Sequence, residues 1–206
     1  MFDFEDFLAR ARSRLLSDPP TSWDRSDDDL NDKARLIPEG VPATAAAVLI
    51  GIVTRTEPTV LLTQRHSGLA KHAGQIAFPG GRVDAGETIQ QAALREAQEE
   101  IGLEADFSAV LGFLPSYLTV TNYQVAPVVA LIQPGFELAL QRAEVDEAFE
   151  VPLSFLMDPA NCKRDGRDWK GIRRHYYVYQ YGPRFIWGAT AGMIRRLHDQ
   201  LYAQAA

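Results

Sequence analysis

The sequence is poor in cysteine and in positive charge. Cys162 is the only cysteine among 206 residues, so no disulfide can form within the chain, and a reducing compartment is favoured. Acidic residues outnumber basic ones, 27 to 21, for a net charge of -6. This balance argues against long nucleic acid as a partner, because binding to a phosphate backbone needs a basic surface. A small phosphorylated ligand stays compatible, since a few local cations are enough to bind it.

Long apolar runs are also missing. No run approaches the roughly 18 residues of a membrane span, and the N-terminus is acidic where a signal peptide would be basic. We therefore expect a cytoplasmic protein with no membrane partner. The rest of the composition is ordinary for a globular protein, with 46% hydrophobic and 23% charged residues, and the length suits one domain with one core.

The first 32 residues have a composition of their own. Apolar residues at helical spacing between residues 3 and 16 predict an amphipathic helix. Packing on the domain, or on a second subunit of a homodimer, is favoured over binding to a membrane surface. Residues 17–32 contain Pro19-Pro20 and Asp27-Asp28-Asp29, which is typical of a linker or a mobile loop with weak order. We therefore divide the chain into an N-terminal helix with an acidic linker, residues 1–32, and a main domain, residues 33–206.

The main domain begins with two apolar runs that favour β-strands. Residues 44–53 and 60–65 are separated by a polar turn, and this predicts a hairpin. Pro127 indicates an edge or a bulge in a later strand. Further strands are expected at residues 108–120, 124–132 and 175–181, and a last helix is expected after residue 188.

One helix is marked unusually clearly at both ends. Thr88 and Gln91 have the spacing of a capping box, and Gly102 followed by Leu103 is typical of a helix that ends on a glycine. Small and strong helix formers lie between them, so we expect a helix that packs closely on a sheet.

Three carboxylates gather on one face of this helix. Glu96 and Glu100 are one turn apart and Glu99 lies beside them, because positions i, i+3 and i+4 are neighbours on an α-helix. Carboxylates crowded in this way repel unless a positive group lies among them. Oxygen ligands on a rigid helix suit Mg²⁺ or Mn²⁺, whose remaining ligands are water and substrate phosphates. A solvated acidic helix face is the alternative, and the Glu99-Glu100 pair alone does not exclude it.

The wider spacing favours the metal site. The pattern resembles the Nudix box, G-x5-E-x7-R-E-U-x-E-E-x-G-U with U a bulky aliphatic residue, and departs from it only at Ala97. The matching residues are Gly81, Glu87, Arg95, Glu96, Glu99, Glu100, Gly102 and Leu103. The resemblance covers residues 43–197 and implies an α/β protein with the Nudix fold, an α/β/α sandwich with a mixed central sheet.

The resemblance also implies a chemistry and a role for each residue. It implies a diphosphatase that uses Mg²⁺ or Mn²⁺. Glu96, Glu99, Glu100 and the Gly80 carbonyl would hold the metal, and Glu87 would support them or hold an outer ion. Arg95 would hold the glutamates in place by ion pairing. One carboxylate must accept the proton of the attacking water. Glu96 and Glu144 are both candidates, and Glu147 is second to Glu144 as the acidic residue supplied from beyond the helix.

A second resemblance concerns the substrate. Residues 61–81, LLTQRHSGLAKHAGQIAFPGG, resemble the coenzyme A pyrophosphatase signature L-L-T-x-R-S/A-x3-R-x3-G-x3-F-P-G-G, and residues 144–153 resemble a later segment of the same branch. His66 replaces a serine or alanine of that signature, and Ala70 replaces an arginine. An arginine can bind a phosphate through two hydrogen bonds, whereas alanine cannot. The candidate substrate-binding cations that remain are Arg65, Lys71, His72 and Arg82.

The first substrate expected is coenzyme A or an acyl derivative, cleaved to 3′,5′-ADP and 4′-phosphopantetheine. ADP-ribose, NADH or a dinucleotide is the alternative that Ala70 leaves open. A nucleotide sensor without catalysis is disfavoured, because no metal-ligand glutamate is missing. An interaction protein that uses the N-terminal helix is supported only by features with simpler explanations.

Overall fold

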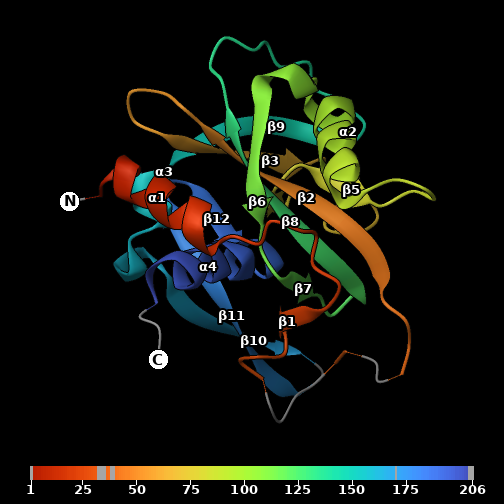
Figure 1. The fold of residues 1–206 in the computed structure, drawn as a ribbon. Helices are drawn as coiled ribbons and strands as arrows, with labels where there is room; N and C mark the ends of the chain where they lie inside the picture. The colour runs from red at the N-terminus through yellow and green to blue at the C-terminus, as the bar shows by residue number, and fades with distance from the viewer. Residues whose placement is uncertain (1, 32–35, 38–39, 170, 204–206) are drawn as a thin grey trace.

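A mixed β-sheet forms the centre of the molecule, with helices on both of its faces (Figure 1). The computed structural model describes residues 2–31, 36–37, 40–169 and 171–203. The helices are α1 (Phe4–Arg14), α2 (Ile89–Ile101), α3 (Leu153–Leu156) and α4 (Ala189–Tyr202), with short 3-10 turns η1 (Ala105–Phe107) and η2 (Pro159–Asn161). The strands are β1 (Trp23–Ser26), β2 (Thr44–Val53), β3 (Thr59–Arg65), β4 (Ile76–Ala77), β5 (Gly80–Arg82), β6 (Ser108–Phe113), β7 (Ser116–Leu118), β8 (Tyr123–Ile132), β9 (Val145–Pro152), β10 (Lys163–Trp169), β11 (Ile172–Tyr181) and β12 (Arg184–Trp187).

The order of strands in the main sheet is β1-β7-β8-β2-β3-β4, with β5 paired to β2, β6 to β8 and β9 to β3. The pairs β2–β8 and β1–β7 are parallel, and the other pairs of this sheet are antiparallel. The hairpin predicted from two apolar runs is confirmed as β2 and β3. Strands β10, β11 and β12 form a separate antiparallel sheet.

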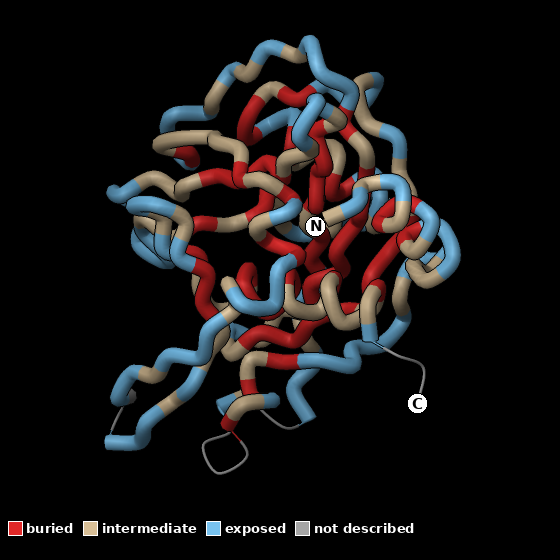
Figure 2. Tube along the Cα trace, turned by 90° about the vertical axis from the view of Figure 1, so that its left-hand side faces the viewer, coloured by how far each residue is buried: buried red, intermediate tan, exposed pale blue. Residues whose placement is uncertain are grey.

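Two hydrophobic clusters lie on opposite faces of the main sheet. One contains the buried side of α2, where Ala92, Ala93 and Ala97 are buried and small enough for the helix to lie close to β2. The other contains the buried sides of α1 and α4. Figure 2 shows these buried stretches in the middle of the molecule, surrounded by exposed loops. The predicted α/β/α sandwich with a mixed sheet is therefore confirmed.

Pro127 does not lie at an edge of the sheet. It is in β8, between β2 on one side and β6 and β7 on the other, so the prediction of an edge strand is wrong. Pairing on the second side passes from β6, at Val128, to β7, at Val125. The residue without an N–H thus falls where one partner strand ends and the next begins.

The N-terminal helix packs on the domain, as favoured by its spacing. The Asp3 carboxylate caps its first turn by accepting from the amides of Glu5 and Asp6. Phe7, Leu8 and Ala11 are buried in the same cluster as α4. In the described part of the chain, no helix is long and apolar enough to cross a membrane.

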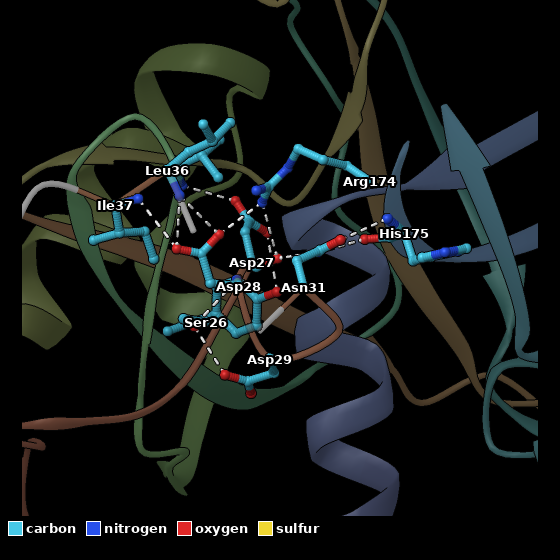
Figure 3. A network of polar contacts seen from close by, with 11 residues as sticks. Ser26, Asp27, Asp28, Asp29, Asn31, Leu36, Ile37, Arg174 and His175 are labelled. Carbon is cyan, nitrogen blue, oxygen red and sulfur yellow. Dashed lines mark hydrogen bonds and ion pairs between the residues drawn. The ribbon is translucent and has the colours of Figure 1, made fainter. Parts of the chain in front are cut away.

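The segment expected to be a mobile linker differs from that expectation. Residues 23–26 form β1, which extends the sheet beside β7. The buried Asp28 carboxylate lies 2.7 Å from the Arg174 guanidinium and accepts from the amides of Leu36 and Ile37 (Figure 3). Asn31 also bonds to the backbone of β11, at His175. The acidic composition reflects specific buried contacts, which composition does not reveal. The boundary expected between residues 32 and 33 lies outside the described residues.

Candidate active site

Helix α2 begins and ends where the sequence predicts. Thr88 Oγ1 accepts from the Gln91 amide at 3.2 Å, and Gln91 Oε1 accepts from the Thr88 amide at 2.9 Å, so both halves of the capping box are present. Gly102 ends the helix in the left-handed conformation, with φ of 72°, which glycine adopts without strain. The two ends fix which residues of α2 face strand β5.

Arg95 lies in the middle of the carboxylates. Its Nε and one terminal nitrogen donate to the two oxygens of Glu87, at 2.9 and 3.1 Å. Its other terminal nitrogen donates to Glu96 at 2.9 Å and to Glu99 at 3.0 Å. The hydrogen bonds to Glu87 and Glu96 raise the pKa of Arg95, and the bonds to Glu87 lower the pKa of that carboxyl. One guanidinium therefore joins three carboxylates that would otherwise repel one another.

Glu100 is the deeply buried acid of the group, only 4% exposed. Its carboxylate accepts from the Gly80 amide at 3.2 Å, and the Arg65 guanidinium lies 3.8 Å away. Burial raises the pKa of Glu100 to about 7, with Glu96 and Glu144 adding negative charge nearby. Burial likewise raises the pKa of Glu96. Glu99, by contrast, keeps 61% of its side chain exposed.

The glycine pair of β5 permits this close arrangement. A Cβ on Gly81 would overlap the Glu96 carboxylate, and a Cβ on Gly80 would overlap the backbone of Ala47 and Val48 in β2. Gly81 therefore lets the acidic face of α2 lie close to β5, and Gly80 lets β5 pair closely with β2. The Gly80 amide reaches Glu100, while coordination of a metal by its carbonyl stays a prediction.

The carboxylates around Arg95 are the groups that could hold a divalent cation. Within the described ranges, no three acidic, histidine or cysteine side chains converge closely enough to form a ready metal cluster. The reason is visible in the contacts, because Arg95 lies between Glu87, Glu96 and Glu99. The donor chemistry nevertheless fits Mg²⁺ or Mn²⁺, which prefer carboxylate oxygens. Burial raises the pKa of Glu96 and of Glu100, and a bound cation would favour the charged form of both.

The four predicted cations do not all lie at the carboxylates. Arg65 does, and its Nε is a buried donor without a hydrogen-bond partner in the part of the chain that the structure describes. Lys71 and His72 are exposed on the loop between β3 and β4. The side chain of Arg82 instead reaches the Tyr123 hydroxyl, although its carbonyl accepts from Arg95 at 3.0 Å.

The two later acids have different surroundings. Glu144 is exposed just before β9, and its carbonyl accepts from the His66 amide at 2.8 Å. Its charge acts on both Glu96 and Glu100. Glu147 is bound by the guanidinium of Arg184 on β12. The structure thus brings Glu144 near the acidic face of α2 and occupies Glu147 elsewhere.

Sequence reasoning missed two contacts around the site. His66 Nδ1 lies 2.5 Å from the Asp146 carboxylate, 80 residues later, because β3 and β9 pair. Arg82 meets Tyr123 because β5 and β8 both pair with β2. Each contact depends on strand pairing between distant segments, for which the sequence carries no local signal.

The comparisons with known proteins agree with the fold. The NUDIX domain family matches residues 43–169. A Nudix hydrolase NudL of Klebsiella pneumoniae, itself uncharacterized, is 44% identical over 168 residues, which are 77% of this chain and 83% of the relative. A protein of the same name from Escherichia coli is 43% identical over 157 residues, covering 76% of this chain and 82% of the relative.

Solved structures show a similar fold at low identity. A crystal structure of DR0079 from Deinococcus radiodurans has a TM-score of 0.51 and 14% identity, covering 78% of this chain and 88% of that one. A MutT/nudix family protein from Enterococcus faecalis has a TM-score of 0.50 and 17% identity, covering 78% of this chain and 62% of that one. At this level of identity the likeness concerns the fold alone.

Proposed function

The chain belongs to the Nudix family, and from this premise we propose that it is a metal-dependent hydrolase that cleaves the diphosphate of coenzyme A or acyl-coenzyme A. The observation that carries the proposal is the acidic face of α2. Glu96 and Glu100 lie against the glycine pair of β5, with Arg65 beside Glu100. Negative groups for a cation and a positive group for a phosphate are therefore adjacent, as cleavage of a diphosphate requires.

Nudix hydrolases generally require a divalent cation such as Mg²⁺ or Mn²⁺. The residues that would hold it here are Glu96, Glu99, Glu100 and the carbonyl of Gly80, with Glu87 supporting them or holding an outer ion. When bound, such an ion neutralises the diphosphate and lowers the pKa of water.

The side chains of the chain itself would then divide the remaining work. Arg95 fixes the carboxylates through four hydrogen bonds, so that they need not reorganise when substrate binds. Arg65 is positioned to bind a phosphate oxygen, and its buried Nε offers a donor for it. Water attacks phosphorus in line with the leaving group, and Glu96 or Glu144 takes its proton.

Coenzyme A is favoured as substrate by the sequence of residues 61–81, which resembles the signature of that branch. The products would be 3′,5′-ADP and 4′-phosphopantetheine, or its acyl form. Ala70 removes one arginine of the signature, and Lys71 and His72 on the same exposed loop are the cations that would replace it. Cleavage of ADP-ribose, NADH or a dinucleotide is the alternative.

Product analysis by mass spectrometry tests the proposal. The protein is incubated with Mg²⁺ or Mn²⁺ and, in separate reactions, with coenzyme A, ADP-ribose and NADH. We expect 3′,5′-ADP and 4′-phosphopantetheine from coenzyme A, and at least about a tenfold loss of rate in Glu99→Gln and Glu100→Gln. Glu104→Gln, an exposed glutamate just beyond α2, is the matched control and should keep full activity.

Each other outcome has a definite meaning. Cleavage of ADP-ribose or NADH alone would retain the hydrolase and reject coenzyme A. Binding of these compounds without cleavage would reject the hydrolase in favour of a nucleotide sensor.

A further inference from the structure

Tyr123 and Arg82 form an aromatic and cationic pair that the chemistry of the carboxylates does not use. The Tyr123 hydroxyl accepts from Nε and a terminal nitrogen of Arg82, at 3.3 and 3.0 Å, and the guanidinium carbon lies 5.7 Å from the centre of the ring. We propose that this pair is a platform on which the nucleobase of the substrate stacks. The proposal rests on the proposed function in one respect, namely that the ligand contains a nucleoside.

The two side chains share one face of the sheet. Arg82 pairs with Ala46 of β2, and Tyr123 pairs with Thr44 of the same strand. Residues two apart on a strand point to the same side, so Arg82 and Tyr123 extend over the same end of β2. The β2 residues between them are small, and Arg82 is exposed while Tyr123 is partly exposed. A flat ligand therefore has access to this pair.

The platform lies close to the carboxylates. The Arg82 carbonyl accepts from Arg95 at 3.0 Å, and the preceding residue, Gly81, lies against Glu96. Positions 81 and 82 face opposite sides of the sheet, so the three-residue strand β5 separates the two sites. Among the described strands β5 pairs with β2 alone, so the sugar and phosphates of a nucleotide would pass around the free edge of β5 to join the two sites.

Tyr123 is held in place by the turn that precedes it. The Thr119 amide donates to the Tyr123 carbonyl at 2.9 Å, and the Tyr123 amide donates to Thr119 Oγ1 at 3.1 Å. Asn122 has φ of 61° and donates through its side chain to the Pro42 carbonyl at 3.0 Å. A residue other than glycine is uncommon in the left-handed region, and surrounding hydrogen bonds of this kind hold it there. The backbone that carries the ring is thus fixed before any ligand arrives.

The Tyr123–Arg82 pair favours ligands that carry a nucleobase but does not discriminate among the bases. An aromatic face stacks on every nucleobase, and a guanidinium adds attraction to the same π-system. An exposed apolar residue, Val41, directly precedes Pro42 and is 54% exposed, which adds apolar surface beside the turn. We therefore expect binding of nucleotides generally and little discrimination among their bases.

The experiment compares two ligands that differ only by the base, AMP and ribose 5-phosphate. Binding is measured by calorimetry, and contact with the base by saturation transfer from protein to the base protons of AMP. The protein should bind AMP more tightly. Tyr123→Leu should weaken AMP about tenfold and leave ribose 5-phosphate unchanged, whereas Tyr123→Phe should retain most of the AMP affinity. Arg82→Met should weaken AMP about threefold.

The control variant is measured with the same two ligands, AMP and ribose 5-phosphate. Phe185→Leu changes another exposed aromatic residue, on β12, and should affect neither ligand. Equal affinity for AMP and ribose 5-phosphate, or an equal loss of both in Tyr123→Leu, would overturn the platform. Neither measurement needs turnover. If no diphosphate is cleaved but AMP still depends on Tyr123, the proposed hydrolysis fails while the platform stands.

Discussion

Arg95, in the middle of α2, binds both oxygens of the Glu87 carboxylate, which lies eight residues earlier and just before the helix. The same guanidinium donates to Glu96 and Glu99. It is therefore the common counterion of the acidic face of α2. The position of each carboxylate depends on the planar shape of that group as well as on its charge.

Arg95→Lys tests the importance of that shape. Lysine keeps the charge but cannot donate to Glu87 through two parallel bonds while also reaching Glu96 and Glu99. We expect Mn²⁺ affinity and turnover to fall about 10- to 100-fold, measured by calorimetric titration and by product formation. The matched control Arg12→Lys, at an exposed position of α1, should change neither. Unchanged Mn²⁺ affinity in Arg95→Lys would show that charge alone is enough.

Gly81→Ala separates activity from stability. The added Cβ would overlap the flexible Glu96 carboxylate, which can move away while the backbone stays. We expect turnover to fall by about 100-fold because a catalytic group is displaced. The free energy of unfolding should change by less than about 1 kcal/mol, measured by urea denaturation.

Gly80→Ala is the contrasting substitution. Its Cβ would overlap the backbone of Ala47 and Val48, which cannot move without disturbing β2. Both turnover and stability should therefore fall. The interpretation of β5 fails if the two alanine variants behave alike.

Asp28→Asn tests the polar contacts of the N-terminal segment. Asp28 is 4% exposed and pairs with Arg174 at 2.7 Å, so the substitution removes a buried ion pair. We expect the free energy of unfolding to fall by roughly 2 to 4 kcal/mol. Asp29→Asn removes a charge from the same segment at a more exposed position and should cost less than about 0.5 kcal/mol. A small effect for both would mean that this segment adds little to stability.

Asp27 gives the stability of the protein a dependence on pH. Burial raises the pKa of Asp27 above its ordinary value of 3.8, and nearby Asp28 raises it further. Bonds from the Val120 amide and the Tyr117 hydroxyl, and the charge of Arg174, act in the opposite direction. Because the native pKa is raised, the contribution of Asp27 is greatest below 3.8. It is lost as the pH rises through the native value.

The variant Asp27→Asn lacks the carboxyl group that titrates. The unfolding free energy of the wild type minus that of the variant should therefore decrease as the pH is raised from 4 to 7, in urea denaturation at each pH. A difference that stays constant, or that increases with pH, contradicts the raised pKa.

Local patterns in the sequence predicted α2 and its surroundings well. The capping box of Thr88 and the glycine end at Gly102 are short-range signals, and both ends of the helix are where they indicate. The prediction failed for residues 17–31, because Asp28 finds its partner 146 residues later. Composition records the acid but not the buried arginine that stabilises it. Arg82 was chosen for its charge and nearness to the box, while its contact with Tyr123 depends on register in the sheet.

The position of α1 has a consequence for synthesis of the chain. Arg14 donates to the Leu201 carbonyl at 2.9 Å, so α1 completes its packing only after α4 has left the ribosome. At roughly 5 to 20 residues per second, the 187 residues between them take on the order of 10 to 40 s to translate. During that interval the apolar side of α1, with Phe7 and Leu8, lacks the part of its native surface that α4 supplies. A nascent chain of this protein thus presents a hydrophobic helix that chaperones can bind.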